Sequence, residues 1–129
     1  MKALLDTHTV LWGMTQPSLL SSSVRTILLD EATEVLISSV VPWELSIKHH
    51  SGKLQEAAAL LSDFSAVMDA LVAKALPVSI RHAILAGDWQ WEHRDLFDRM
   101  LAAQAATEGA ILVSRDQVFD TLPGLRRFW

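Results

Sequence analysis

The chain has 129 residues but no cysteine, no tyrosine and no long apolar run. Without cysteine it can form neither a disulfide framework nor a cysteine-ligated zinc site. The longest apolar runs, such as residues 40–43 and 57–61, are far too short to cross a bilayer. Only three apolar residues separate Lys2 from Asp6, so we expect no signal peptide, no membrane association and a cytoplasmic location.

Basic residues are also in the minority, because 11 Lys and Arg stand against 15 Asp and Glu, for a formal net charge of -4. This balance excludes a protein that coats nucleic acid by bulk charge, but it does not exclude a nucleic acid substrate. Half of the residues are hydrophobic and only 20% are charged, which excludes disorder over most of the chain. The length fits a single domain over residues 1–129.

Short apolar runs alternate with helical patterns along the chain. Strands are predicted near residues 2–6, 35–38, 76–79, 110–114 and 125–129. Helices are predicted over residues 7–15, 21–32, 42–52, 55–75 with a break near Ser62, 80–86 and 97–108. This alternation indicates an α/β fold with a mainly parallel central sheet of about four to five short strands flanked by helices.

Four acidic residues fall at the ends of these elements. Asp6 follows the first strand, and Asp116 lies just beyond the strand near 111–114. Glu44 and Asp98 each fall near the first turn of a helix. Ligands bind outside the carboxyl ends of the strands in an open parallel sheet, so all four side chains could face one crevice.

Several carboxylates in one crevice repel each other unless a cation compensates them. Oxygen-only ligation suits Mg²⁺ or Mn²⁺, and such an ion can activate water and stabilise charge on a phosphodiester. The pattern therefore suggests metal-assisted phosphodiester hydrolysis. Without these four acids the chain has eleven acidic and eleven basic residues, so its acidity can be assigned wholly to the metal site.

Each acid also has a purely structural explanation. Asp6 and Asp116 could cap the turns that follow them, and Asp95 and Asp98 have the spacing of a helix N-cap and its third residue. Glu44 and Lys48, four residues apart, could form a surface ion pair. Spacing alone leaves both explanations open.

Four segments carry a resemblance to the PIN-domain nucleases, and more narrowly to VapC-like toxins of bacterial toxin–antitoxin pairs. They are residues 4–12 (LLDTHTVLW), 38–54, which include PWELSIK, 93–105 (HRDLFDRMLAAQA) and 112–116 (LVSRD). The resemblance implies that Asp6, Glu44, Asp98 and Asp116 surround Mg²⁺ or Mn²⁺, with Asp6 and Asp98 as the usual metal ligands. It leaves open whether one ion or two are bound.

The resemblance also assigns supporting positions. Thr7 and Ser114 match hydroxyl positions that hold water or a carboxylate, and Arg99 and Arg115 match positions where a base meets the substrate phosphate or a neighbouring carboxylate. Asp95 competes with Asp98 for its place. Leu96 stands where similar proteins often have proline, which leaves the helix entry less rigid.

The implied function is that of a metal-dependent endoribonuclease, the toxin of a toxin–antitoxin pair. Water would attack an RNA phosphodiester and leave a 5′-phosphate and a 3′-hydroxyl. The implied partners are RNA, a cognate antitoxin protein and a second copy in a homodimer. Two alternatives stay open: a phosphoryl-transfer domain of the receiver or haloacid-dehalogenase type, and a catalytically inactive PIN-like scaffold that only binds a partner.

Overall fold

A five-stranded, all-parallel sheet organises the chain, and the computed structural model describes all residues 1–129. The strands lie in the order β3-β2-β1-β4-β5. Their bounds are β1 (Lys2–Leu5), β2 (Glu34–Ser38), β3 (Ala73–Leu76), β4 (Ile111–Val113) and β5 (Arg127–Phe128). The predicted α/β fold with a parallel sheet is therefore confirmed, including the terminal strand at one edge.

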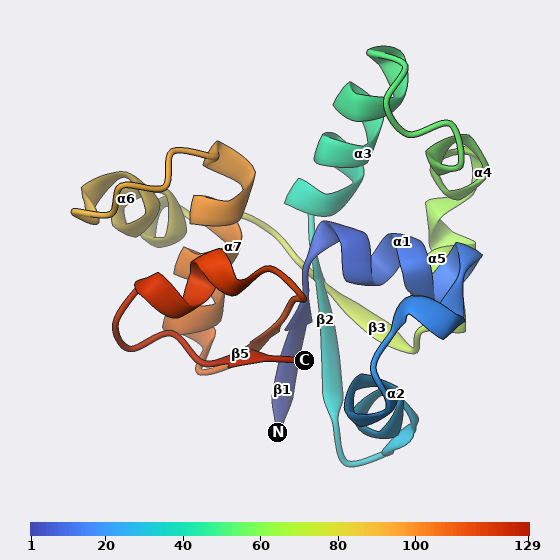
Figure 1. Cartoon of the computed structure of the whole chain (residues 1–129), viewed down its shortest axis with the longest axis horizontal. Coiled ribbons are helices and arrows are strands. Elements are labelled where there is room, and N and C mark those ends of the chain that lie inside the picture. Colours follow the sequence, from blue (N-terminus) through green and yellow to red (C-terminus); the bar gives the residue numbers. More distant parts are fainter.

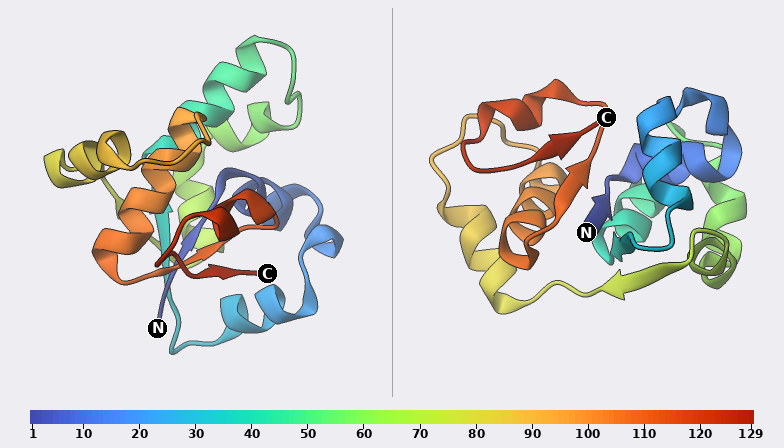
Figure 2. Two further views of the ribbon diagram at one scale, coloured as in Figure 1. Left: turned by 60° about the vertical axis from the view of Figure 1, so that its left-hand side comes forward. Right: turned by 90° about the horizontal axis from the view of Figure 1, so that it is seen from below.

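Seven α-helices and two 3₁₀ helices connect the strands. They are α1 (Thr7–Thr15), η1 (Pro17–Leu19), α2 (Ser22–Leu29), α3 (Val40–His50), α4 (Ala57–Ser62), α5 (Phe64–Ala70), α6 (Ile80–Asp88), α7 (Leu96–Glu108) and η2 (Gln117–Thr121). Helices α6 and α7 lie on one side of the strands, and α1, α2, α4 and α5 lie on the other (Figure 1 and Figure 2). None of these helices combines the length and the apolar character that crossing a membrane requires.

The core forms because the central strands are apolar on both faces, as a sheet covered by helices on both sides demands. Leu4 and Leu5 of β1 and Leu112 of β4 are fully buried. Leu11 of α1 and Leu101 of α7 reach the same cluster from the flanking helices. The polar carboxyl edge of the sheet is thereby held on a rigid base.

One predicted element differs from the structure. The expected helix over 55–75 is two short helices, α4 and α5, followed by β3, which begins about three residues before the predicted strand. Asp63 causes the break near Ser62 because its carboxylate accepts a hydrogen bond from Ala66 N (3.2 Å). Val72 adopts a left-handed φ of 49°, which ends α5 and turns the chain into the sheet edge. The break near Ser62 was predicted, whereas the apolar spacing continues through Val72 and hides the second break.

Candidate functional site

Two of the four predicted acids follow neighbouring strands of the sheet. Asp6 comes directly after β1 and caps α1, with its Oδ1 accepting from Thr9 N at 2.8 Å. Asp116 follows β4 and caps η2 by accepting from Val118 N at 3.0 Å. Because β1 and β4 are hydrogen-bonded to each other, their carboxyl ends bring both acids to one edge of the sheet.

Glu44 reaches this edge from α3. The helix begins at Val40, two residues earlier than predicted, so Glu44 lies in the second turn. The Thr7 hydroxyl donates to Glu44 Oε1 at 2.5 Å, and Lys48 pairs with Glu44 Oε2. The Glu44 side chain is only 5% exposed, so the Glu44–Lys48 pair is not the surface ion pair that spacing alone allowed.

Asp95 and Asp98 reach the edge from the start of α7. Asp95 is the N-cap and accepts from Asp98 N at 2.9 Å. Asp98 Oδ2 lies 2.7 Å from His93 Nε2. Asp95 is exposed and caps the helix, whereas the Asp98 side chain is partly buried and does not serve as the cap.

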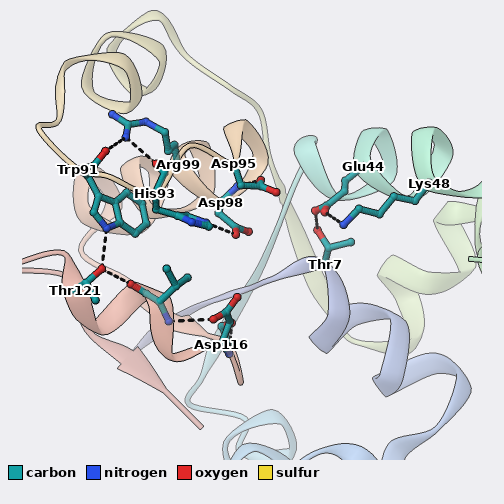
Figure 3. Close-up of polar contacts among 12 residues, drawn as sticks. Thr7, Glu44, Lys48, Trp91, His93, Asp95, Asp98, Arg99, Asp116 and Thr121 are labelled. Carbon is teal, nitrogen blue, oxygen red and sulfur yellow. Dashed lines mark hydrogen bonds and ion pairs between the residues drawn. The ribbon is translucent and has the colours of Figure 1, made fainter. Parts of the chain in front are cut away.

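These acids line one cavity of about 260 Å³. Its nine lining residues are all polar: Asp6, Thr7, His8, Glu44, Lys48, His93, Asp95, Asp98 and Asp116. In Figure 3, Glu44, Thr7 and Lys48 lie on one side, and Asp98, His93 and Asp116 lie on the other. Asp6, Asp95 and Asp116 each cap a helix and also line the cavity, so a capping role does not exclude a role in a shared site.

Burial disfavours the ionised forms of two carboxylates in the cavity. Burial raises the pKa of Asp6, although hydrogen bonds from Ser114 and Thr9 partly oppose this. Burial also raises the pKa of Asp98 to about 6; the hydrogen bond with His93 lowers it, and Asp95 and Glu44 raise it further. Two acids whose charged forms are destabilised create a place where a cation is favourable.

The donor chemistry fits a hard divalent cation, since the acids and Thr7 offer oxygen ligands. No group of three His, Asp or Glu side chains converges closely enough to chelate an ion in the present rotamers. Asp98 is instead bonded to His93, and Glu44 to Thr7 and Lys48. Metal binding would therefore require these carboxylates to rotate from their present partners.

Two buried hydroxyls support the acids. Ser114 Oγ, in a fully buried residue, accepts from the backbone N–H of Asp116 at 3.1 Å. Thr9 Oγ1 donates within reach of both Asp6 Oδ1 (2.7 Å) and Val113 O (2.9 Å), and so links α1 to β4. Thr9 was not identified from the sequence because one threonine in an apolar helix gives no distinct signal.

The two predicted arginines have different surroundings. Arg99 does not line the acidic cavity. Its guanidinium donates to four backbone oxygens, those of Ala86, Trp89, Trp91 and His93, at 2.7–3.0 Å. Arg99 thereby holds the 89–93 loop, including His93, which bonds Asp98. Figure 3 shows Arg99 beside Trp91 and His93. Arg115 is exposed and lies over the Trp12 ring, with 5.9 Å between Cζ and the ring centroid.

Three further lining residues, His93, Lys48 and His8, were not predicted from the sequence. Lys48 was considered only as a surface partner, although its i,i+4 spacing from Glu44 was a usable signal. His93 depends on the path of the 87–94 loop, which the sequence does not determine. His8 lies one helical turn before Trp12, and its aromatic contact with Trp12 is visible only in the structure.

Comparison with known proteins relates the chain to a family. The family model of the PIN domain matches residues 3–125. No curated protein matches the chain. Similar solved structures include VapBC2 from Rickettsia felis bound to a DNA fragment from their promoter, with 20% identity, a TM-score of 0.70 and coverage of 99% of this chain and 98% of that chain.

Two further structures share the fold. DNA-bound VapBC from Salmonella typhimurium has 21% identity and a TM-score of 0.71, with 99% of this chain and 97% of that chain covered. VapBC-1 from nontypeable Haemophilus influenzae has 18% identity and a TM-score of 0.67, with the same two coverages. The family match extends over nearly the whole chain and includes every acid of the cavity, and the chain therefore belongs to the PIN domain family.

Proposed function

We propose that this protein is a metal-dependent endoribonuclease that hydrolyses RNA phosphodiester bonds. The observation that carries the proposal is the cavity in which Asp6, Glu44, Asp98 and Asp116, from four separate segments, meet without any apolar neighbour. Membership of the PIN family supports nuclease chemistry and leaves no support for a receiver or dehalogenase domain.

The four acids would hold Mg²⁺ or Mn²⁺, with Asp6 and Asp98 as its main ligands. When bound, such an ion lowers the pKa of a bound water and offsets charge on the phosphate under attack. Thr7 and Lys48 orient the Glu44 carboxylate, and Thr9 orients that of Asp6. Attack of water on the phosphodiester would leave a 5′-phosphate on one product and a 3′-hydroxyl on the other, as the resemblance to PIN-domain nucleases implies.

The proposed biological role is that of a cytoplasmic toxin with a cognate antitoxin. Its support is the similarity of the fold to the VapBC structures and to FitAB bound to a DNA fragment. A homodimer is proposed as the assembly that meets the antitoxin. Growth arrest on expression, relieved by co-expression of a small protein encoded beside this gene, would support this role. Unimpaired growth with active nuclease in the cell would contradict it.

The test of the activity is cleavage of total and structured RNA with Mg²⁺ or Mn²⁺. We expect cleavage that EDTA abolishes and that Asp6→Asn and Asp98→Asn each reduce by at least about a hundredfold, because each variant removes a charged metal ligand. Glu31→Gln is the matched control, since Glu31 is exposed in the turn before β2.

The chemical groups at the ends of the cleaved RNA test whether the reaction is hydrolysis by water. Sequencing of RNA ends should find 5′-phosphates and 3′-hydroxyls at the cut sites. Full activity in either Asn variant would show that the substituted residue is not required for catalysis. Absence of cleavage at high protein concentration, with folded protein and both metals tested, would favour the inactive scaffold instead.

A further inference from the structure

A second hollow adjoins the acidic cavity. It has a volume of about 470 Å³ and is lined by Asp6, His8, Trp12, Arg115, Asp116 and Gln117. Asp6, His8 and Asp116 line both spaces, so the two lie side by side. A strand whose phosphate lies at the acids would therefore have its next nucleotide in this second hollow.

Trp12 gives the hollow an aromatic wall that is fixed in place. Its ring meets the edge of Trp129, with centroids 5.9 Å apart and planes inclined by 68°. His8, one turn earlier on α1, lies 5.5 Å from the same ring. Both residues line the hollow, and Trp12 is only partly buried and His8 exposed, so the hollow has an accessible aromatic wall. Such surfaces stack on nucleic acid bases of any sequence.

Arg115 gives the hollow a cation that no carboxylate neutralises. The other basic groups beside the acids are committed: Lys48 to Glu44, Arg99 to four backbone oxygens, and Arg127 to Asp120 and Ser114 O. Arg115 makes no ion pair or side-chain hydrogen bond and only lies over Trp12. The N–H groups of a guanidinium in such a contact are not used by it, so they can bond a phosphate.

We propose that His8, Trp12 and Arg115 form a nucleotide subsite next to the acidic cavity. Arg115 bonds the phosphate adjacent to the one under attack, and the aromatic surface of Trp12 and His8 stacks on the neighbouring base. The subsite rests on the proposed RNA-cleaving function. It adds the direction in which the RNA strand runs from the acidic cavity, past His8, Trp12 and Arg115. It also explains how a chain with net charge -4 binds a polyanion, through one local cation and stacking.

Binding can be separated from cleavage by measuring anisotropy of a short fluorescein-labelled single-stranded RNA over a range of salt, with Ca²⁺ in place of Mg²⁺. Arg115→Ala should weaken binding and make the slope of log K against log salt shallower by about 0.7, the value for one phosphate contact on a single strand. Trp12→Leu should weaken binding on the order of tenfold with the slope unchanged, because stacking releases no counterion.

Arg25→Ala is the matched control, since Arg25 is an exposed arginine on α2 and should alter neither quantity. Trp12→Phe keeps most of the packing against Trp129 and serves if Trp12→Leu does not fold. A wild-type slope and affinity in Arg115→Ala, or no RNA binding by the wild type, would overturn the subsite. Binding with the expected variant effects, but no cleavage in Mg²⁺ or Mn²⁺, would overturn the proposed function and keep the subsite.

Discussion

His93 Nε2 lies 2.7 Å from Asp98 Oδ2, and this contact joins the 89–93 loop to the first turn of α7. The carboxylate keeps a pKa raised to about 6 despite this partner, because burial and the charges of Asp95 and Glu44 outweigh it. The ionised form of Asp98 is therefore a source of instability in the metal-free protein.

Asp98→Asn should stabilise the metal-free protein more at about pH 8 than at about pH 4. The folded pKa of Asp98 lies above the ordinary aspartate value of 3.8, so the folded state binds the proton more tightly, and stability falls as pH rises between 3.8 and about 6. The penalty is complete above about 6, and we expect about 1–2 kcal/mol after solvent screening. Urea unfolding in EDTA at the two pH values measures it.

Glu31→Gln is the control for this comparison, because Glu31 is exposed and its neutralisation should leave the pH dependence unchanged. An equal effect of Asp98→Asn at both pH values would show that burial does not raise the pKa of this carboxyl in the folded protein.

Thr9→Val should destabilise the fold by about 1–3 kcal/mol. The substitution conserves shape but removes the hydroxyl beside Asp6 Oδ1 and Val113 O, in a residue that is 1% exposed. Thr26→Val is a close control, since Thr26 bonds Ser22 O at 2.9 Å on the exposed face of α2. The free energies of unfolding of the two variants should differ clearly; equal values would contradict a structural link between α1 and β4.

Arg99→Ala should cost about 3 kcal/mol and loosen the 89–93 loop. Four backbone oxygens lose their donor together, and each unsatisfied partly buried carbonyl is unfavourable. Arg99→Lys should restore little of the lost stability, because a single ammonium cannot bond all four oxygens that the planar guanidinium bonds at once. Hydrogen exchange of residues 89–93 provides the readout, with Arg81→Ala as the exposed control. Wild-type protection in Arg99→Ala would refute the anchoring role.

Mn²⁺ should raise the melting temperature of the wild type and not that of Asp6→Asn. A ligand that binds only the folded state at a hundredfold excess over its Kd adds about 2.7 kcal/mol. The effect should grow as pH rises through about 6, because the cation competes with the proton on Asp98. A shift of equal size in Asp6→Asn would place the metal elsewhere.

The residue pattern was sufficient to predict the parallel sheet and the positions of the acids along it. Apolar strands such as β1 and β4 end at polar residues, and parallel connections put those ends at one edge. Of the two helix breaks, the one at Asp63 was predicted, near Ser62, and the one at Val72 was not. A single left-handed residue turns the backbone without interrupting the apolar spacing.

By itself the sequence determined that the chain folds as one α/β domain and that Asp6 and Asp116 follow strands of its sheet. Only the tertiary structure decided which basic groups remain free, since Arg99 and Arg115 look alike beside their acids. Backbone carbonyls of a distant loop bind the first, whereas the second lies over Trp12 beside the acids. Contacts between segments far apart in the chain leave no periodic trace in the sequence, and they settle what each side chain is free to bind.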